Sequence, residues 1–244
     1  MKPMKVLVLD VGGTHIKVAS TDIRIPIKIV SGPTMDAKAM VDQVIASTAK
    51  WEYDAISIGY PGPVGHDRPL SEPHNLAPGW VNFNYQKAFA GKPIRFINDA
   101  AMQALGGYQG GRMLFLGTGT GLGSAMIFDG VVVPLELAHL PYKKGRTYEE
   151  YIGLGGLERR GRKRWRKSVL TIIELLKAGL VCDYVLLGGG NAKLMKKLPK
   201  GVLLGANSNA IDGGIALWKD DAVVTSRTPG KGEAPDSVIL AKPN

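Results

Sequence analysis

Asp10-Val-Gly-Gly-Thr14 stands between an apolar run that ends at Leu9 and an alternating run, His15-Ile-Lys-Val-Ala-Ser20. A similar arrangement returns in the second half of the chain as Leu114-Phe-Leu-Gly-Thr-Gly-Thr-Gly-Leu-Gly123, followed by Ser124-Ala-Met-Ile-Phe128. In each copy the pattern predicts a strand, a turn of glycine and threonine, and a second strand. The duplication favours a chain of two α/β halves.

Both turns concentrate backbone N–H groups and hydroxyls in a tight loop, which suits phosphate oxygens. Two such loops facing each other would grip a polyphosphate chain from both sides, and Asp10 could hold the metal ion between them. This arrangement is typical of a phosphotransferase. The alternative for either loop alone is a glycine-containing hairpin turn without a ligand, and the duplication makes that the weaker interpretation.

Two better-known phosphate motifs are absent from the sequence. No Gly-x-x-x-x-Gly-Lys-Ser/Thr occurs, and the glycines from Gly117 to Gly123 do not follow the Gly-x-Gly-x-x-Gly spacing. They also lead into a predicted strand, whereas both nucleotide motifs require a helix at that point. The sequence therefore argues against a P-loop or Rossmann nucleotide site.

Length and composition indicate a cytoplasmic enzyme. A chain of 244 residues with 45% hydrophobic content can bury a sizeable core in one large or two small domains. Cys182 is the only cysteine, which excludes disulfides and cysteine-based zinc sites and indicates a reducing compartment. The N-terminal apolar run is short and interrupted by Asp10, so we expect no signal peptide, and no run approaches a membrane span.

Positive charge is concentrated in one segment. The net charge is +10, and residues 141–167 hold ten Lys/Arg against three Glu. Such a field attracts polyanions. The alternative is a solvated helix face, because apolar residues recur at helical spacing and leave the cations pointing outward: Leu157, Gly161, Trp165, Val169, Ile172 and Leu176. The two interpretations are compatible, because a long anion would bind to a basic helix face that is exposed to solvent.

Hydrophobic periodicity places the remaining elements. Strands are predicted at 6–9, 15–20, 23–30, 55–59, 94–97 and 184–187, and helices at 36–50, 100–108, 157–177 and 208–218, with a short basic helix after Gly188-Gly-Gly-Asn191. A long loop over 60–84 is typical of a functional segment. We expect an N-terminal domain over 1–98, a C-terminal domain over 99–219 whose last helix packs back on the first, and a flexible tail over 220–244.

Six motifs occur in the order found in the sugar kinases of the ROK family (repressor, open reading frame, kinase). They are Asp10-x-Gly-Gly-Thr14, Gly59-x-Pro-Gly62, Asn98-Asp99, Gly117-Thr-Gly-x-Gly121, Glu136-Leu-x-His139 and Gly188-Gly-Gly190. Within that family the chain is most similar to the polyphosphate-using glucokinases, over roughly residues 5–218. The resemblance implies the actin-like ATPase (ribonuclease H-like) fold, with two domains flanking a cleft that the sugar and the phosphoryl donor enter from opposite sides.

The resemblance implies that Asp99 is the catalytic base. A sugar hydroxyl is a poor nucleophile, and a carboxylate within about 3 Å can accept its proton as the phosphoryl group transfers. Asn98 beside it would hydrogen-bond the sugar. Without the resemblance, an Asn-Asp pair after a strand is more typical of a helix N-cap.

Glu136 and His139 resemble the sugar-binding pair of the family, although on their own they would read as a local surface pair. Gly62 and Asn75 match the sugar side, as does the Gly79-Trp80 pair, in which Trp80 has a plain core residue as its alternative. In most ROK kinases the matching histidine also binds a structural zinc with three nearby cysteines. Those cysteines are absent here, so no zinc is expected. Ala138 stands where the family usually has glycine, which leaves the sugar selectivity less defined.

The donor side is implied in the same way. The matching positions are Gly12, Gly13 and Thr14 in the first phosphate loop, Thr118 and Gly119 in the second, and Gly189 and Gly190, with Asn191, in a third that packs near adenosine in ATP-using relatives. Mg²⁺ would bridge the donor and Asp10. Lys17 could neutralise phosphate charge, or be an exposed strand lysine.

The combined hypothesis is a cytoplasmic glucokinase that phosphorylates the 6-hydroxyl of glucose from inorganic polyphosphate, with ATP as a second donor. One rival is an ATP-dependent kinase of another hexose or an amino sugar. Another is a non-catalytic sugar-sensing regulator, but the first predicted strand starts by about Lys5, so we do not expect the N-terminal helix-turn-helix of the family's repressors. The resemblance also implies a homodimer, and we expect neither specific nucleic-acid binding nor a membrane partner.

Overall fold

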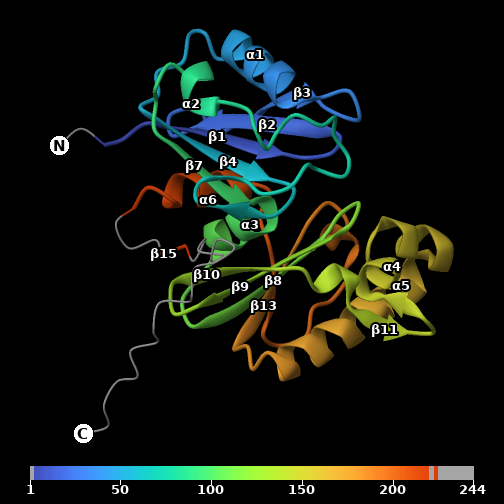
Figure 1. Ribbon diagram of the computed structural model, residues 1–244. Helices are drawn as coiled ribbons and strands as arrows, with labels where there is room; N and C mark the ends of the chain where they lie inside the picture. Colours follow the sequence, from blue (N-terminus) through green and yellow to red (C-terminus); the bar gives the residue numbers. More distant parts are fainter. Residues whose placement is uncertain (1–2, 220–222, 225–244) are drawn as a thin grey trace, which may run out of the picture.

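The computed structural model describes residues 3–219 and 223–224 of the chain. Two β-sheets lie one above the other, and the helices α3 (Asp99–Gly107) and α6 (Asn209–Ala216) run between them (Figure 1). The helix α1 (Ala37–Ser47) covers the first sheet, and the long helix α5 (Leu154–Gly179) covers the second. Among the described residues, no helix is both long and apolar enough to cross a membrane.

The first sheet has five strands in the order β3-β2-β1-β4-β7. Their bounds are β1 Val6–Val11, β2 His15–Ser20, β3 Ile27–Val30, β4 Ala55–Tyr60 and β7 Ile94–Asn98. Strands β1, β4 and β7 run parallel, and every residue of β1 and β4 is buried. This burial on both faces explains why β1 reads as a continuous apolar run that only Asp10 interrupts.

The second sheet has six strands in the order β14-β13-β8-β9-β10-β15. Their bounds are β8 Arg112–Thr118, β9 Leu122–Phe128, β10 Val131–Leu135, β13 Tyr184–Gly188, β14 Val202–Leu204 and β15 Val223–Val224. Strands β8 and β13 run parallel, and β8, β9 and β10 form an antiparallel meander. The strand, turn, strand repeat of the sequence is therefore confirmed as β1-β2 in one sheet and β8-β9 in the other.

Glycines allow α3 and α6 to pack closely between the sheets. A Cβ atom on Gly213 would lie 1.8 Å from the carbonyl oxygen of Met102, and one on Gly106 would lie 1.9 Å from that of Asn209. α6 also contacts the first sheet, where Ser57 Oγ donates a 2.6 Å hydrogen bond to the carbonyl oxygen of Gly214. The position of α3 matters for the site, because this helix begins at Asp99.

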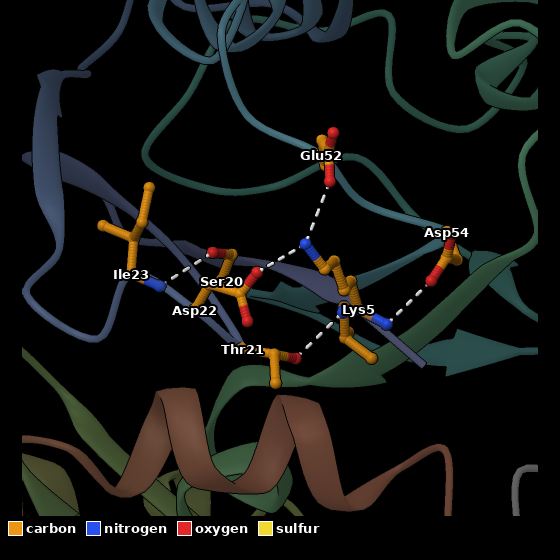
Figure 2. A network of polar contacts seen from close by, with 8 residues as sticks. Lys5, Ser20, Thr21, Asp22, Ile23, Glu52 and Asp54 are labelled. Atoms are coloured by element: carbon orange, nitrogen blue, oxygen red, sulfur yellow. Dashed lines mark hydrogen bonds and ion pairs between the residues drawn. The ribbon is translucent and has the colours of Figure 1, made fainter. Parts of the chain in front are cut away.

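Lys5 ties together the amino ends of the first sheet's central strands (Figure 2). Its Nζ lies 2.8 Å from Asp22 and 3.0 Å from Glu52, and its backbone N–H donates to Asp54 at 2.9 Å. A surface hollow of about 570 Å³ beside this network is lined in part by Lys5, Trp51 and Glu52. Because Lys5 precedes β1 and Asp10 lies near the far end of that strand, this hollow sits at the opposite end of the strands from the predicted Asp10, Gly59 and Asn98-Asp99 motifs.

Shorter elements fill the connections. They are β5 Val64–Gly65, β6 Arg68–Pro69, α2 Tyr85–Ala88, the 3₁₀ turn η1 Leu137–His139, β11 Pro141–Lys143, β12 Arg146–Thr147, α4 Tyr148–Ile152 and the 3₁₀ turn η2 Ala192–Leu194. The basic helix predicted after Gly188-Gly-Gly-Asn191 is thus a single 3₁₀ turn. The predicted flexible tail over 220–244 lies outside the described residues, apart from β15.

The basic helix α5 differs from its prediction in two respects. It starts at Leu154 and is interrupted at Gly161, whose φ of 72° breaks the helix. Because of this break Gly161 is exposed, while the rest of the predicted stripe from Trp165 onward is buried. The expectation that every cation points outward is wrong for Arg160 and Arg166, which are partly buried and donate hydrogen bonds to other residues of the protein. Arg159 is exposed as expected, although it also donates to the carbonyl oxygen of Glu150.

Candidate active site

The parallel strands of the first sheet bring three predicted motifs to one edge. Asp10 is paired with Gly59, and Tyr60 with Asn98. The carboxyl ends of adjacent parallel strands lie side by side, which is where open α/β sheets bind ligands. Asp10, the loop from Gly59 to Gly62 and the Asn98-Asp99 pair are therefore neighbours.

Asn98 forms the N-cap of α3, as the alternative interpretation of this pair predicted. Its Oδ1 accepts a hydrogen bond from the N–H of Ala101 at 3.1 Å. Its Nδ2 donates to the carbonyl oxygen of Gly62 at 3.3 Å. One side chain thus holds the start of the helix and the neighbouring loop in a fixed relation, and so sets the position of Asp99.

Asp99 is the first residue of α3 and is partly exposed. Its pKa is raised to about 7, first by burial and then by the negative charges of Asp10 and Glu136, against the opposing hydrogen bond from the N–H of Ala100. Three carboxylates from β1, α3 and the turn before η1 therefore lie close enough to influence one another. A carboxyl group with a pKa near neutral pH is well matched to general base catalysis.

Asp10 is buried and forms an ion pair with Lys17. Lys17 lies directly opposite Asp10 on β2, and its Nζ is 2.8 Å from Asp10 Oδ2. The side chain of Lys17 is still 41% exposed, against 8% for that of Asp10. Lys17 therefore compensates the buried carboxylate, and its outer part remains accessible to a further anion.

The first glycine loop is a tight turn beside Asn75. The N–H of Gly12 donates to the carbonyl oxygen of His15 at 3.1 Å, and Ser31 Oγ donates to the carbonyl oxygen of Gly12 at 2.6 Å. A Cβ atom on Gly13 would lie 3.1 Å from Cβ of Asn75. The fold thus brings the exposed Asn75, from the long loop, next to the exposed Thr14 of the first loop.

The second and third loops follow adjacent parallel strands, since Gly117 on β8 pairs with Gly188 on β13. Gly189 has a φ of 81°, and a Cβ atom there would lie 2.6 Å from the backbone of Thr118. Thr118 is fully buried, and its hydroxyl donates to the carbonyl oxygen of Gly188 at 3.1 Å. That hydroxyl therefore joins the two loops, and any contribution of Thr118 to a phosphate would come from its backbone.

Every carbonyl oxygen of the second loop, from Thr118 to Gly121, accepts a hydrogen bond from another residue of the protein. Those of Thr118 and Gly119 accept from the backbone and side chain of Asn191, at 2.9 and 3.0 Å. Those of Thr120 and Gly121 accept from the N–H groups of Leu154 and Gly119, at 3.1 Å each.

The amide N–H groups of Thr120 and Gly121 have no partner among the described residues. A Cβ atom on Gly119 or on Gly190 would meet nothing within 4 Å. A loop whose carbonyl oxygens are bonded and whose amides are free can bind an anion.

Glu149 is a residue that the sequence analysis missed. Its Oε2 accepts a 2.9 Å hydrogen bond from the N–H of Leu122, at the end of the second loop, from 27 positions away in the chain. The sequence shows Glu149 only as one of the few acids in the basic segment. No local pattern marks it, because the contact depends on how α4 packs against β9.

Glu136 directly precedes η1, His139 is its last residue, and both are exposed. Ser124 anchors this turn: its hydroxyl donates to the carbonyl oxygen of Leu135 at 2.9 Å and accepts from the N–H of Leu137 at 3.1 Å. Glu136 acts electrostatically on Asp99, whereas the side chain of His139 makes no hydrogen bond or ion pair among the described residues. The turn therefore places at least the carboxylate of the predicted sugar pair near the candidate base.

Trp80 is a core residue. It is fully buried, its ring centroid lies 5.7 Å from that of Tyr60, and its Nε1 donates to the carbonyl oxygen of Ala77 at 2.9 Å. The interpretation of Trp80 as a core residue is therefore confirmed.

The carboxylates present fit a magnesium ion that is held mainly by substrate. Among the described residues, no group of three or more His, Cys, Asp or Glu could form a metal cage. Mg²⁺ bound with substrate phosphates needs only one or two protein carboxylates and keeps several waters. Asp10 offers one such carboxylate, two positions before Gly12 of the first glycine loop and close enough to act electrostatically on Asp99.

Comparison with known proteins agrees with this arrangement. No protein-family model matches the chain. Polyphosphate glucokinase of Mycobacterium tuberculosis is 25% identical over 211 residues, which cover 78% of each chain.

Solved structures of other proteins superimpose on most of the molecule. The inorganic polyphosphate/ATP-glucomannokinase of Arthrobacter sp. strain KM matches with a TM-score of 0.72 and 23% identity, covering 87% of this chain and 97% of the other. A ROK-family glucokinase of Streptomyces griseus, solved with glucose and AMPPNP, matches with a TM-score of 0.62 and 18% identity, covering 86% and 98%. The resemblance to the ROK sugar kinases, and with it the actin-like ATPase fold, is confirmed.

Proposed function

We propose that the protein is a sugar kinase that transfers the terminal phosphoryl group of inorganic polyphosphate, with ATP as a second donor, to the 6-hydroxyl of glucose. The observation that carries this proposal is Asp99, whose pKa is raised to about 7 at the edge where the Asp10 loop and the Glu136 turn meet. The names of the related glucokinases support the sugar and the donor.

In the proposed reaction the sugar's 6-hydroxyl oxygen attacks the terminal phosphorus of the donor. The bond from that phosphorus to the bridging oxygen breaks, and the donor leaves as a chain one phosphate shorter. Asp99 accepts the hydroxyl proton, Asn98 and Asn75 orient the sugar with Glu136 and His139, and the backbone amides of the glycine loops hold donor oxygens. Mg²⁺ held by Asp10 would neutralise charge on the transferring group.

We also propose that the domain boundary lies between residues 98 and 99, where β7 ends and α3 begins. The two sheets would then flank the reacting groups, with α3 delivering the base from the boundary itself. The homodimer and the cytoplasmic location implied by the resemblance stay predictions.

A matrix of donors and acceptors tests the proposal. Polyphosphate, ATP and GTP are each combined with glucose, mannose, fructose and N-acetylated sugars, and sugar phosphate is measured. We expect glucose with polyphosphate to give the highest kcat/KM. Activity confined to ATP with another hexose or an amino sugar would support the first rival, and sugar binding without turnover with any donor would support a regulator.

The sugar-binding turn yields a prediction that separates affinity from turnover. Glu136→Gln and His139→Ala should each weaken glucose binding by about 1–3 kcal/mol, the usual effect of losing a charge-assisted hydrogen bond. The KM for the donor should change little. Steady-state kinetics with each substrate varied in turn would measure the split, and a matched loss of donor affinity would contradict the assignment.

A further inference from the structure

A second basic segment follows the third glycine loop. Residues 189–211 contain four lysines and no Asp or Glu. All four are exposed: Lys193, Lys196, Lys197 and Lys200. The apolar side chains between them are partly buried and pack against the core, so the segment holds its lysines toward solvent.

The exposed cations of α5 form a similar surface after the break at Gly161. Residues 159–173 contain no Asp or Glu. Four cations there are exposed and make no side-chain hydrogen bond or ion pair among the described residues: Arg162, Lys163, Arg164 and Lys167. Arg160 differs, because its guanidinium stacks 4.4 Å from the ring centroid of Tyr151.

The two basic segments lie side by side although about thirty positions separate them in the chain. Arg166 Nε donates a 2.6 Å hydrogen bond to the carbonyl oxygen of Leu194. Leu194, Met195 and Leu198 pack against the core cluster that includes Trp165. Arg162 lies one helical turn before Arg166, on the side of α5 that faces the lysine segment.

The lysine segment starts at the candidate donor site. Asn191, which bonds the carbonyl oxygens of Thr118 and Gly119, precedes Lys193 by two positions. The open backbone at Gly119 and Gly190 therefore continues directly into exposed cations. An anion seated on the second and third loops and extending outward would meet them next.

We propose that these eight cations form one basic surface that binds the part of an inorganic polyphosphate chain lying beyond the glycine loops. The basic surface consists of Arg162, Lys163, Arg164, Lys167, Lys193, Lys196, Lys197 and Lys200. This inference rests on the proposed function and extends it, because it assigns a binding site for the length of the donor to residues outside the six motifs.

The composition of the surface favours polyphosphate over nucleic acid. Proteins that bind single-stranded nucleic acid combine basic grooves with exposed aromatic side chains on which the bases stack. The one aromatic residue in 161–173 and 189–200 is Trp165, which is fully buried. The surface thus offers charge without a stacking platform, which suits a polymer that consists only of phosphates.

Charge contacts of this kind predict a dependence on chain length and on salt. A chain that reaches the basic surface releases condensed counterions at each contact, as a nucleic-acid backbone does, so its affinity should fall steeply with salt concentration. ATP and tripolyphosphate are short enough to be held by the glycine loops alone. The basic surface should therefore act on long donors and leave short ones unchanged.

Two triple variants and a matched control test the proposal. The first replaces Lys193, Lys196 and Lys197 with glutamine, and the second replaces Arg162, Lys163 and Lys167. The control replaces Lys28, Lys50 and Lys87 with glutamine. These lysines are exposed on the first half of the chain, and replacing them removes the same amount of charge. Affinity for labelled long-chain polyphosphate is measured without sugar over a range of salt, and KM is measured for long-chain polyphosphate, tripolyphosphate and ATP.

Each basic-surface variant should weaken the binding of long-chain polyphosphate about tenfold or more at physiological salt. The slope of log affinity against log salt should also become shallower by about 2, because each of the three lost contacts accounts for about 0.7 of that slope. The control variant should bind like the parent. Variants that handle long polyphosphate like the parent, or that lose tripolyphosphate and ATP equally, would overturn the proposal. So would single-stranded DNA of equal charge that competes as well as polyphosphate.

Failure of this inference and failure of the proposed function give different results. If the protein binds long polyphosphate through these residues but phosphorylates no sugar, the basic surface stands and the kinase proposal fails. If sugar phosphorylation proceeds and the two triple variants match the control, the kinase proposal stands and the basic surface fails.

Discussion

Replacing Asp99 with asparagine should lower kcat by about 10²–10⁴ while changing glucose affinity little. Asparagine keeps the size of the side chain and its acceptor for the N–H of Ala100, but it cannot take up the hydroxyl proton. Measurement of kcat by sugar phosphate formation, together with glucose binding by calorimetry, would test this. A variant with more than a tenth of the parent's kcat would show that Asp99 is not the base.

The raised pKa of Asp99 adds a pH dependence to the same test. Activity requires the carboxylate, so kcat/KM of the parent should fall as the pH drops below about 7. Saturating Mg²⁺ should shift this fall in kcat/KM to lower pH, because a nearby cation favours the ionised form of the Asp99 carboxyl group.

The same substitution should stabilise the folded protein at alkaline pH. A pKa above the ordinary value means that the folded state binds the proton more tightly than the unfolded chain does. The stability that Asp99 contributes is therefore full below its ordinary pKa of 3.8 and is lost as the pH rises to about 7. At pH 8, Asp99→Asn should raise the free energy of unfolding by about 1–3 kcal/mol, after allowance for partial exposure to water, and the gain should shrink toward pH 5.

Asp183 provides a control of opposite sign. Hydrogen bonds from Arg112 hold the pKa of its carboxyl below the ordinary value, so Asp183→Asn should not stabilise the protein at any pH. Denaturant unfolding at pH 5 and pH 8 would measure both variants. A loss of stability for Asp99→Asn at pH 8 would contradict the electrostatic account of the site.

Asp10→Asn should have the second largest effect on catalysis. Losing this carboxylate should lower kcat by about 10²–10³ and raise the Mg²⁺ concentration needed for half-maximal activity, because the metal would lose its charged protein ligand. Glucose affinity should stay near that of the parent. An Mg²⁺ titration of activity at saturating donor and sugar would give both quantities.

Lys17→Met distinguishes the role of Asp10 in holding the metal from its role in the ion pair with Lys17. It removes the partner of Asp10 but keeps the carboxylate, so it should raise the KM for the donor without raising the Mg²⁺ requirement. An unchanged Mg²⁺ dependence in Asp10→Asn would show that Asp10 acts on the structure of the loop rather than on the metal.

Much of the fold could be predicted from the sequence because its signals are local. The alternation in β2, the buried run of β1 and the glycine turns between strands depend on neighbouring residues, and each of these elements was predicted within a few positions. Asp36 and Asn98 follow the same principle, since both cap the helices that begin after them. The ends of α5 and the break at Gly161 were missed, because a helical stripe does not show where a single glycine leaves the helical conformation.

The sequence by itself determined the strand, turn, strand repeats, the position of Asp99 after a buried strand, and the resemblance that ordered motifs carry. Only the tertiary structure decided which of these residues act together. The coupling of Asp99 to Asp10 and Glu136, the buried hydroxyl of Thr118 and the contact of Arg166 with the lysine segment all join residues far apart in the chain. Such contacts depend on how sheets and helices pack, and periodicity within a segment carries no information about the segment that will lie against it.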